Sequence, residues 1–219
     1  AKAAADAIEA DARAAIADRG RFSLVLSGGS TPKLLYTLLA EHYAARLDWP
    51  NVDIYFGDER CVGPDHPDSN YRMANLAMLA KLPAAVHRIP AELGPRVASQ
   101  IYAGTLPSAS PIFDLVLLGM GPDGHTASLF PGHDFAADRG YTVTPATAPA
   151  GFAISDRVTL TRDALGSSRR VLALITGKDK TARLAEVLRE RSSGTPTYPM
   201  SRVRPEGVEF LVDEAAAAP

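Results

Sequence analysis

A chain of 219 residues, 46% hydrophobic and 22% charged, can bury a sizeable core and suits one α/β domain over residues 1–219. The formal net charge of −2 lacks the basic excess of a nucleic-acid-binding protein, and no apolar run approaches the roughly 18 residues of a membrane span. Cys61 is the only cysteine, which excludes an internal disulfide and a cysteine-based zinc site. We therefore expect a cytoplasmic protein without nucleic-acid or membrane partners. A monomer is one option for its assembly, since composition does not determine the oligomeric state.

The predicted elements alternate between helices and strands. Ile8, Ala12, Ala15 and Ile16 form one stripe of an amphipathic N-terminal helix. Apolar runs and helical periodicity then predict, in chain order, a strand over Phe22–Ser27, a helix over Pro32–Arg46, a strand over Asn51–Phe56, a helix over Ser69–Leu82, a short strand over Val86–Ile89, a helix over Arg96–Leu106, strands over Phe113–Leu118 and Val171–Thr176, a helix over Asp179–Arg191 and a strand over Val208–Asp213.

This alternation predicts the fold class. Continuous apolar strands separated by helices favour an α/β fold with a mostly parallel, Rossmann-like sheet covered by helices on both faces. The stretch Tyr141–Thr161 departs from the pattern and reads as extended strands around a proline-containing loop, so we expect a small excursion or lobe there. Ligands of such folds bind beyond the carboxyl ends of the strands.

The first segment in that position is Ser27-Gly28-Gly29-Ser30-Thr31-Pro32. The glycines permit close approach of the backbone to an anion, Pro32 suits the first helical position, and Ser30 or Thr31 is a candidate helix cap. Free N–H groups at the helix start and two hydroxyl groups predict a phosphate-binding loop. A simple strand-to-helix turn is the alternative, and the Gly-Lys-Ser/Thr ending of a Walker A loop is absent.

The second segment is Gly57-Asp58-Glu59-Arg60, which places three charges directly after a predicted buried strand. The planar guanidinium of Arg60 suits either a phosphate or an oxyanion. A surface salt-bridge cluster is the alternative interpretation.

The third segment, residues 119–132, follows the clearest predicted strand. Asp123 and His125 are its only ionisable side chains, and glycines at 119, 121 and 124 indicate a tight turn. A histidine at the end of a strand is a natural general base near neutral pH. A structural histidine bonded to its own loop is the alternative.

The fourth segment, Gly177-Lys178-Asp179-Lys180, lies between a predicted strand and a helix. A lysine there can reach an anion over the edge of the sheet, whereas a solvated helix start is the alternative. Arg157 and Arg162 are further candidate cations.

Together these segments resemble the 6-phosphogluconolactonase family, which provides the second enzyme of the oxidative pentose phosphate pathway. The matching motifs are SGGSTP at 27–32, DER at 58–60, DSNYRM at 68–73, FDLVLLGMGPDGHTASLFPG at 113–132, RVTLT at 157–161 and GKDK at 177–180. The 20-residue segment is the most specific of them, and the match runs in order over nearly the whole chain.

The resemblance implies a carboxylic ester hydrolase that opens 6-phospho-D-glucono-1,5-lactone without a cofactor or metal. It implies that His125 is the base, that Asp58 is a site residue, and that Arg60 and Lys180 meet the substrate phosphate. It also implies that Gly28, Gly29, Ser30 and Thr31 line the same pocket, with Arg157 as a further binding candidate.

Three alternatives remain open. Glucosamine-6-phosphate deaminases share the fold of the family, but typically have tyrosine after Asp-Glu and Ala-Phe-Asn-Glu-Pro after Asp-Gly-His, where this chain has Arg60 and Ala127-Ser128-Leu129-Phe130-Pro131. A non-catalytic sugar-phosphate-binding module is the second alternative. A metallohydrolase is the third, but its candidate ligands lack helical metal-site spacing and are expected in solvated loops; they are Asp65, His66, Asp68, His133 and Asp134. A serine hydrolase is disfavoured because no GxSxG motif is present.

Overall fold

The computed structural model describes residues 1–204 and 207–217, and its core is a six-stranded sheet. The strands are ordered β4-β2-β1-β5-β8-β9, and every neighbouring pair is parallel. Their bounds are β1 Phe22–Leu26, β2 Val52–Phe56, β4 Ala85–Val86, β5 Leu115–Leu118, β8 Arg170–Ile175 and β9 Val208–Val212. All four residues of β5 are buried, as expected for a strand covered on both faces. The predicted α/β class and parallel sheet are confirmed.

A second, antiparallel sheet of three strands is ordered β3-β7-β6. Strands β6 (Val143–Thr147) and β7 (Asp156–Leu160) occupy the predicted excursion, and β3 (Asp58–Arg60) joins them from a distant part of the chain. In the register of β3 with β7, Asp58 lies opposite Thr159. This sheet places the Asp-Glu-Arg segment beside the carboxyl ends of the parallel strands.

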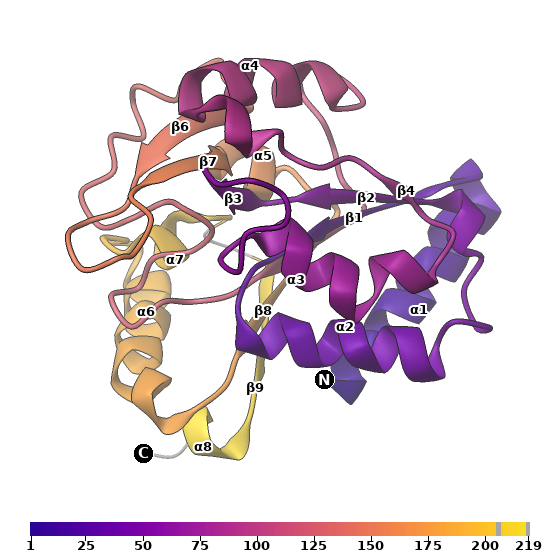
Figure 1. Ribbon diagram of the computed structural model, residues 1–219. Coiled ribbons are helices and arrows are strands. Elements are labelled where there is room, and N and C mark those ends of the chain that lie inside the picture. The colour runs from indigo at the N-terminus through magenta and orange to yellow at the C-terminus, as the bar shows by residue number, and fades with distance from the viewer. Residues whose placement is uncertain (205–206, 218–219) are drawn as a thin grey trace.

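Helices lie on both sides of the main sheet (Figure 1). In that view α2 and α3 lie below strands β1 and β2, whereas α4 lies above them with β6 and β7. Helix α1 packs against α2 and β1. The helices are α1 Lys2–Arg19, α2 Ser30–His42, α3 Asn70–Ala77, α4 Pro95–Thr105, α5 Arg162–Gly166, α6 Thr181–Ser193, α7 Pro199–Arg202 and α8 Glu214–Ala217, with 3-10 turns η1 Trp49–Asn51, η2 Leu79–Lys81, η3 Ala91–Leu93 and η4 Lys178–Lys180. No helix in the described ranges is long and apolar enough to cross a membrane.

Two fully buried tyrosines hold the ends of the strands that lead into the site. The Tyr36 hydroxyl accepts from the N–H of Ser27 at 2.9 Å and donates to its carbonyl at 2.7 Å. The Tyr102 hydroxyl forms the same pair of bonds with Phe56, at 2.8 and 2.9 Å. Because β1 and β2 end at these points, the two phenols satisfy backbone groups that the strand ladder no longer reaches.

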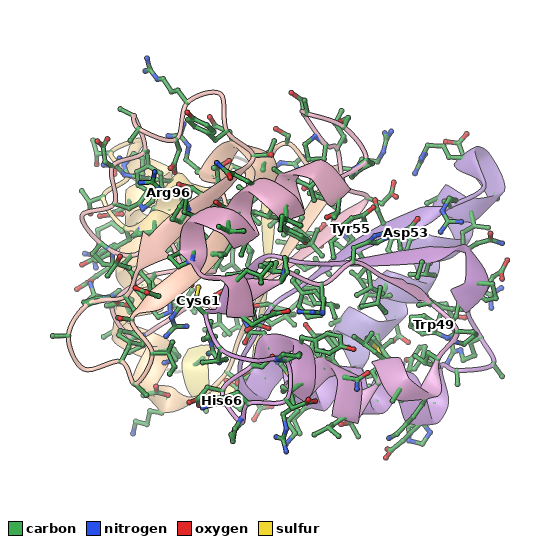
Figure 2. The ribbon with its side chains drawn as sticks, turned by 45° about the horizontal axis from the view of Figure 1, so that its top comes forward. Trp49, Asp53, Tyr55, Cys61, His66 and Arg96 are labelled. Atoms are coloured by element: carbon green, nitrogen blue, oxygen red, sulfur yellow. The ribbon has the colours of Figure 1, made fainter. Side chains whose placement is uncertain are left out.

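Several predicted boundaries are wrong, although their elements exist. Helix α2 begins at Ser30 rather than Pro32 and ends at His42 rather than Arg46, because the chain then turns to bury Leu47 and Trp49. Trp49 lies at one end of the molecule, ahead of β2, in Figure 2. Helix α3 ends at Ala77 rather than Leu82, because the following residue leaves the helical conformation and η2 continues the chain.

The remaining differences are smaller. In place of the predicted strand over Val86–Ile89, β4 is Ala85–Val86, and both of its residues pair with β2. Helix α6 begins at Thr181, since Lys178–Lys180 forms a 3-10 turn. Strand β3 and the short helices α5, α7 and α8 are not predicted by the sequence pattern.

Candidate active site

The carboxyl ends of β1, β2, β5 and β8 meet around a cavity of about 240 Å³. From β1 the chain runs first to β2 on one side and later to β5 on the other, which makes this the topological switch point where open α/β sheets bind ligands. The cavity is lined by residues 27–32, Asp58, Arg60, Asn70, Gly119, Met120, Gly121, His125, Ala127, Phe130, Phe152, Arg157, Leu174, Ile175, Thr176 and Lys180.

His125 is held by the turn that follows β5. Its Nδ1 lies 2.5 Å from Oδ1 of Asp123, and its main-chain N–H donates to the same oxygen at 3.2 Å. Because a carboxylate only accepts, Nδ1 carries the hydrogen and Nε2 carries the lone pair. The imidazole also packs on Gly121, where a Cβ atom would stand 2.1 Å from the ring. His125 is therefore bonded to its own loop, as the alternative interpretation predicts. Because the bond uses Nδ1, Nε2 remains available as a base.

A short helix far along the chain supports this turn. Gly124 has φ +82°, and a Cβ atom there would meet the ring of Tyr198 at 2.8 Å. The carbonyl of Gly124 accepts from the N–H of Met200 in α7 at 3.1 Å. Glycine at 124 is thus required both for its left-handed conformation and for the approach of α7.

The SGGST loop, defined here as Ser27–Thr31, leads from β1 into α2. The residue before the helix is Gly29, with φ +106°, and no side chain caps the helix. The predicted capping by Ser30 or Thr31 is therefore wrong, because both lie inside the first turn, and Pro32 is the third helical residue. The first N–H groups of α2 have no intrahelical partner and lie at the cavity. Thr31 bonds Thr176 after β8 at 2.5 Å between hydroxyl oxygens, which closes the loop against the sheet.

Asp58 is buried at the cavity wall, with both carboxylate oxygens held by neutral donors. Ser128 Oγ donates to Oδ2 at 2.7 Å, and Asn70 Nδ2 donates to Oδ1 at 3.3 Å. Neither oxygen forms an ion pair with a cation of the described residues. The two donors fix the orientation of the carboxylate.

Glu59, the neighbour of Asp58, points away from the cavity and holds the start of α3. Its carboxylate accepts from the N–H groups of Asn70 and Tyr71, both at 2.7 Å, and from the Ser69 hydroxyl at 3.0 Å. Burial raises its pKa, and these N–H donors oppose that rise. Ser69 caps the same helix by accepting a hydrogen bond from the N–H of Arg72. Glu59 is therefore a structural carboxylate.

Three cations lie in the cavity wall. Arg157 is only 6% exposed, and its Nε donates to the carbonyl of Ile154 at 2.9 Å. Burial lowers the pKa of its guanidinium, and the charge of Arg60 lowers it further. Arg60 donates from Nη1 to the carbonyl of Asp68 at 2.5 Å, while its buried Nε has no partner among the described residues. Lys180 pairs with the exposed Asp179 at 2.9 Å.

Two aromatic residues that the sequence did not single out enclose His125. The imidazole centroid lies 4.7 Å from the ring of Phe130 and 5.7 Å from that of Phe152, which meets it edge-on. Phe152 comes from the loop between β6 and β7, and the Arg157 guanidinium lies 5.8 Å from its ring centroid. No local motif marks Phe152, because only the antiparallel sheet brings its loop over the cavity.

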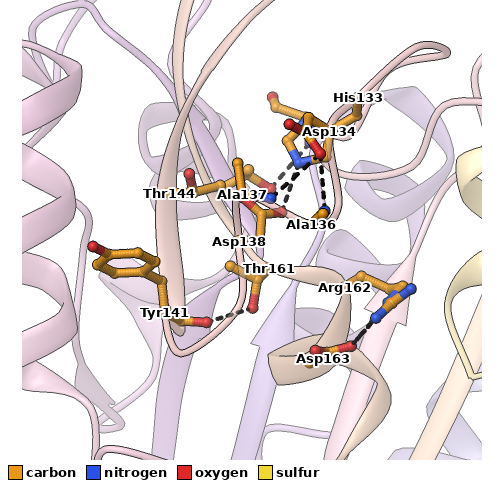
Figure 3. A network of polar contacts seen from close by, with 12 residues as sticks. His133, Asp134, Ala136, Ala137, Asp138, Tyr141, Thr144, Thr161, Arg162 and Asp163 are labelled. Carbon is orange, nitrogen blue, oxygen red and sulfur yellow. Dashed lines mark hydrogen bonds and ion pairs between the residues drawn. The ribbon is translucent and has the colours of Figure 1, made fainter.

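The suggested metal ligands and Arg162 lie elsewhere. His66 lies at the edge of the molecule in Figure 2, and Asp65, Asp68 and Asp134 are likewise exposed. His133 is not solvated as predicted, because Nε2 bonds the buried Asp138 at 2.6 Å (Figure 3). Arg162 pairs with Asp163 in the same view, outside the cavity. No group of three or more His, Cys, Asp or Glu side chains in residues 1–204 and 207–217 is arranged to hold a metal ion.

The structure thus brings to one cavity the nine site residues that the resemblance implies, whereas Arg162 and the suggested metal ligands lie outside it. The nine are Gly28, Gly29, Ser30, Thr31, Asp58, Arg60, His125, Arg157 and Lys180. Sequence reasoning missed Asn70, Ser128, Phe130 and Phe152. Asn70, Ser128 and Phe130 belong to the matching motifs, which were the signal that could have found them, whereas Phe152 lies in no motif.

Comparisons with known proteins identify the family of this chain. The family model for glucosamine-6-phosphate isomerases/6-phosphogluconolactonase matches residues 1–212. A 6-phosphogluconolactonase of Nostoc sp. is 37% identical over 216 residues, covering 93% of this chain and 87% of the relative. One of Rattus norvegicus is 37% identical, covering 91% and 81%.

Solved structures give the same result. The crystal structure of 6-phosphogluconolactonase from Thermotoga maritima superposes with a TM-score of 0.83 at 33% identity, covering 97% of this chain and 94% of that one. A monomeric glucosamine-6-phosphate deaminase, at 22% identity and a TM-score of 0.80, shares the fold. The chain belongs to the glucosamine-6-phosphate isomerase/6-phosphogluconolactonase family.

Proposed function

We propose that this chain is a 6-phosphogluconolactonase, which hydrolyses 6-phospho-D-glucono-1,5-lactone to 6-phosphogluconate. The observation that carries the proposal is one cavity lined by an oriented histidine, three cations and the first turn of α2. The relatives named 6-phosphogluconolactonase, at 33–38% identity over most of the chain, support the same activity. A lactone is an activated ester, so a positioned water, a base and charge stabilisation suffice.

In the proposed reaction, neutral His125 takes a proton at Nε2 from a water molecule as the water oxygen bonds to the ring carbonyl carbon. Asp123 stabilises the imidazolium that forms and keeps the ring in place. The carbonyl oxygen becomes an oxyanion, which N–H groups at the start of α2 or a guanidinium can meet. The bond from the carbonyl carbon to the ring oxygen then breaks, and His125 returns its proton to that oxygen.

The phosphate of the substrate provides binding energy away from the reacting carbonyl. Lys180, the SGGST loop and the two arginines are the proposed ligands, and a phosphate also offers Arg60 Nε the partner that it lacks. Two roles remain for Arg60, since the same guanidinium suits either the phosphate or the oxyanion. Comparing phosphorylated with unphosphorylated lactones separates them.

The deaminase alternative is disfavoured by the surroundings of His125. Aligning the two five-residue runs puts Phe130 where deaminases typically have glutamate. In this chain an apolar ring packs on the imidazole in place of an ionisable group. That environment suits a single general base acting on a neutral lactone carbonyl.

The decisive experiment is to measure acid release from freshly prepared 6-phosphogluconolactone, corrected for spontaneous hydrolysis. Release that scales with enzyme concentration supports the proposal. Turnover of glucosamine 6-phosphate with ammonia release would establish the deaminase instead. Tight binding of 6-phosphogluconate without turnover would establish a binding module.

We further propose that residues 1–219 act as one domain in a cytoplasmic monomer that does not bind nucleic acid. The single cysteine and the net charge of −2 support the location and the lack of a nucleic-acid partner. Sedimentation analysis of the purified chain tests the monomer.

A further inference from the structure

The side chain of Asn70 contacts two segments of the cavity that are distant in sequence. Its Nδ2 donates to the main-chain oxygen of Asp58 at 3.0 Å and to the carboxylate Oδ1 at 3.3 Å. Its carboxamide also lies against Gly28, where a Cβ atom would stand 2.1 Å from Oδ1. Asn70 is 3% exposed and lines the cavity. One carboxamide therefore sets the separation between the SGGST loop and Asp58.

The position of Asn70 is itself fixed by α3. It is the first residue of that helix, and its main-chain N–H donates to Glu59 Oε1 at 2.7 Å. With Asn70 holding Oδ1 of Asp58 and Ser128 holding Oδ2, each carboxylate oxygen has one neutral donor. Loss of either donor frees the carboxylate to rotate.

Gly28 provides the second half of the argument. Its φ lies outside the left-handed region, in contrast to Gly29 at +106°, so a larger residue would suffer no backbone strain there. The reason for glycine at position 28 is space, and Asn70 occupies that space. An added methyl group must push the carboxamide off its two bonds to Asp58.

We infer that Asn70 is a positioning residue of the proposed hydrolase: its carboxamide orients Asp58 and seats the SGGST loop beside it. The inference rests on the proposed function, because the expected effect on turnover is measured as the rate of lactone hydrolysis. The proposed reaction gives no role to the DSNYRM segment at residues 68–73, and this inference gives one to its third residue, Asn70.

The test is the exchange Asn70→Asp, which keeps the size of the side chain and removes the NH₂ donor. An acidic residue is favourable in the first turn of a helix, but at this buried position it lies beside the carboxylate of Asp58, so the circular dichroism spectrum and thermal midpoint of the variant are measured alongside kcat to show that it folds. We expect kcat to fall about 100-fold and KM to change less than about 3-fold, since displacing a group of the site by about 1 Å can lower the rate about 100-fold. The matched control is Asn75→Asp on the same helix, whose side chain forms no hydrogen bond within the described ranges; its kcat should change less than about 2-fold. If Asn70→Asp kept more than about a third of wild-type kcat, the inference would be overturned.

A second measurement does not depend on turnover. Gly28→Ala should lower the thermal midpoint in the wild-type background and have little effect in the Asn70→Ala background, where the space is free. If Gly28→Ala lowered the thermal midpoint equally in both backgrounds, Asn70 would not determine the position of the loop. If the wild-type chain failed to hydrolyse the lactone, the proposed function would fall, whereas this cycle would still decide whether Asn70 seats the loop.

Discussion

Arg60 and Arg157 are direct cross-strand partners in the antiparallel ladder between β3 and β7. Two guanidinium groups at neighbouring positions repel each other, and Arg157 is also buried. A dianion bound between them would relieve both costs, which supports the proposed phosphate site. On that proposal, the antiparallel sheet contributes charge that holds a phosphorylated substrate.

Replacement of either arginine should weaken phosphate binding. We expect Arg60→Ala, Arg157→Ala and Lys180→Ala each to raise KM about 10- to 100-fold, because a charge-assisted hydrogen bond contributes about 1.5–3 kcal/mol. The measurement is kcat and KM on phosphorylated and unphosphorylated lactones, with the exposed Arg189→Ala as a control. If kcat/KM of one variant fell equally on both substrates, the replaced residue would not be a phosphate ligand. For Arg60, that result would place the guanidinium at the oxyanion.

His125→Asn should retain the fold and the affinity for the phosphate but lose most of kcat. General-base catalysis contributes about 10²–10⁴-fold, and asparagine cannot accept a proton near neutral pH. Single-turnover rates and the Kd for 6-phosphogluconate separate the two effects. A variant that kept more than about a tenth of wild-type kcat would make His125 structural and Asp58 the leading base.

Phe152→Ala should open the cavity beside His125 without unfolding the chain, since Phe152 is already 38% exposed. Aromatic contacts of this kind contribute about 0.5–1.5 kcal/mol, so we expect kcat/KM to fall about 2- to 10-fold. Tyr141→Ala, at an exposed loop aromatic outside the cavity, is the control. An unchanged kcat/KM for Phe152→Ala would show that its ring takes no part in the site.

Glu190 should make stability depend on pH. Burial acts to raise its pKa, but donors from Ser201, Thr197 and Tyr198 outweigh burial and bring the pKa to about 2 from the usual 4.5. The folded-state pKa is the lower one, so this stabilisation is present above pH 4.5 and is lost as pH falls toward 2.

Thermal midpoints of the wild type and Glu190→Gln provide the measurement. The wild type should be the more stable at pH 7, and the gap should narrow progressively below pH 4.5. Glu41→Gln, at an exposed residue that forms no hydrogen bond among the described residues, is the control. A gap of constant size from pH 7 to pH 3 would contradict the prediction.

Lactone hydrolysis should persist in excess EDTA. The reason is the donor set: within the described part of the chain no three His, Cys, Asp or Glu side chains converge, and His133 is engaged by Asp138. Activity lost in EDTA and restored by a divalent metal would show that a metal takes part.

The sequence by itself determined the parallel sheet and the location of His125, the proposed base. Continuous apolar runs such as Leu115–Leu118 have few alternatives to a buried strand, and the residues after such strands meet at one edge of the sheet. That rule alone brings the SGGST loop, Asp58, His125 and Lys180 together.

Only the tertiary structure decided which side chains orient these groups. Strand β3 carries three charges and has no apolar pattern, so it exists because β7 pairs with it and Glu59 is satisfied by α3. Asn70 faces Gly28, and Phe152 faces His125, across separations that no local propensity encodes. Backbone preferences act over a few residues, whereas these contacts form only when distant segments pack, which is why the sequence located the site but not the residues that hold it in shape.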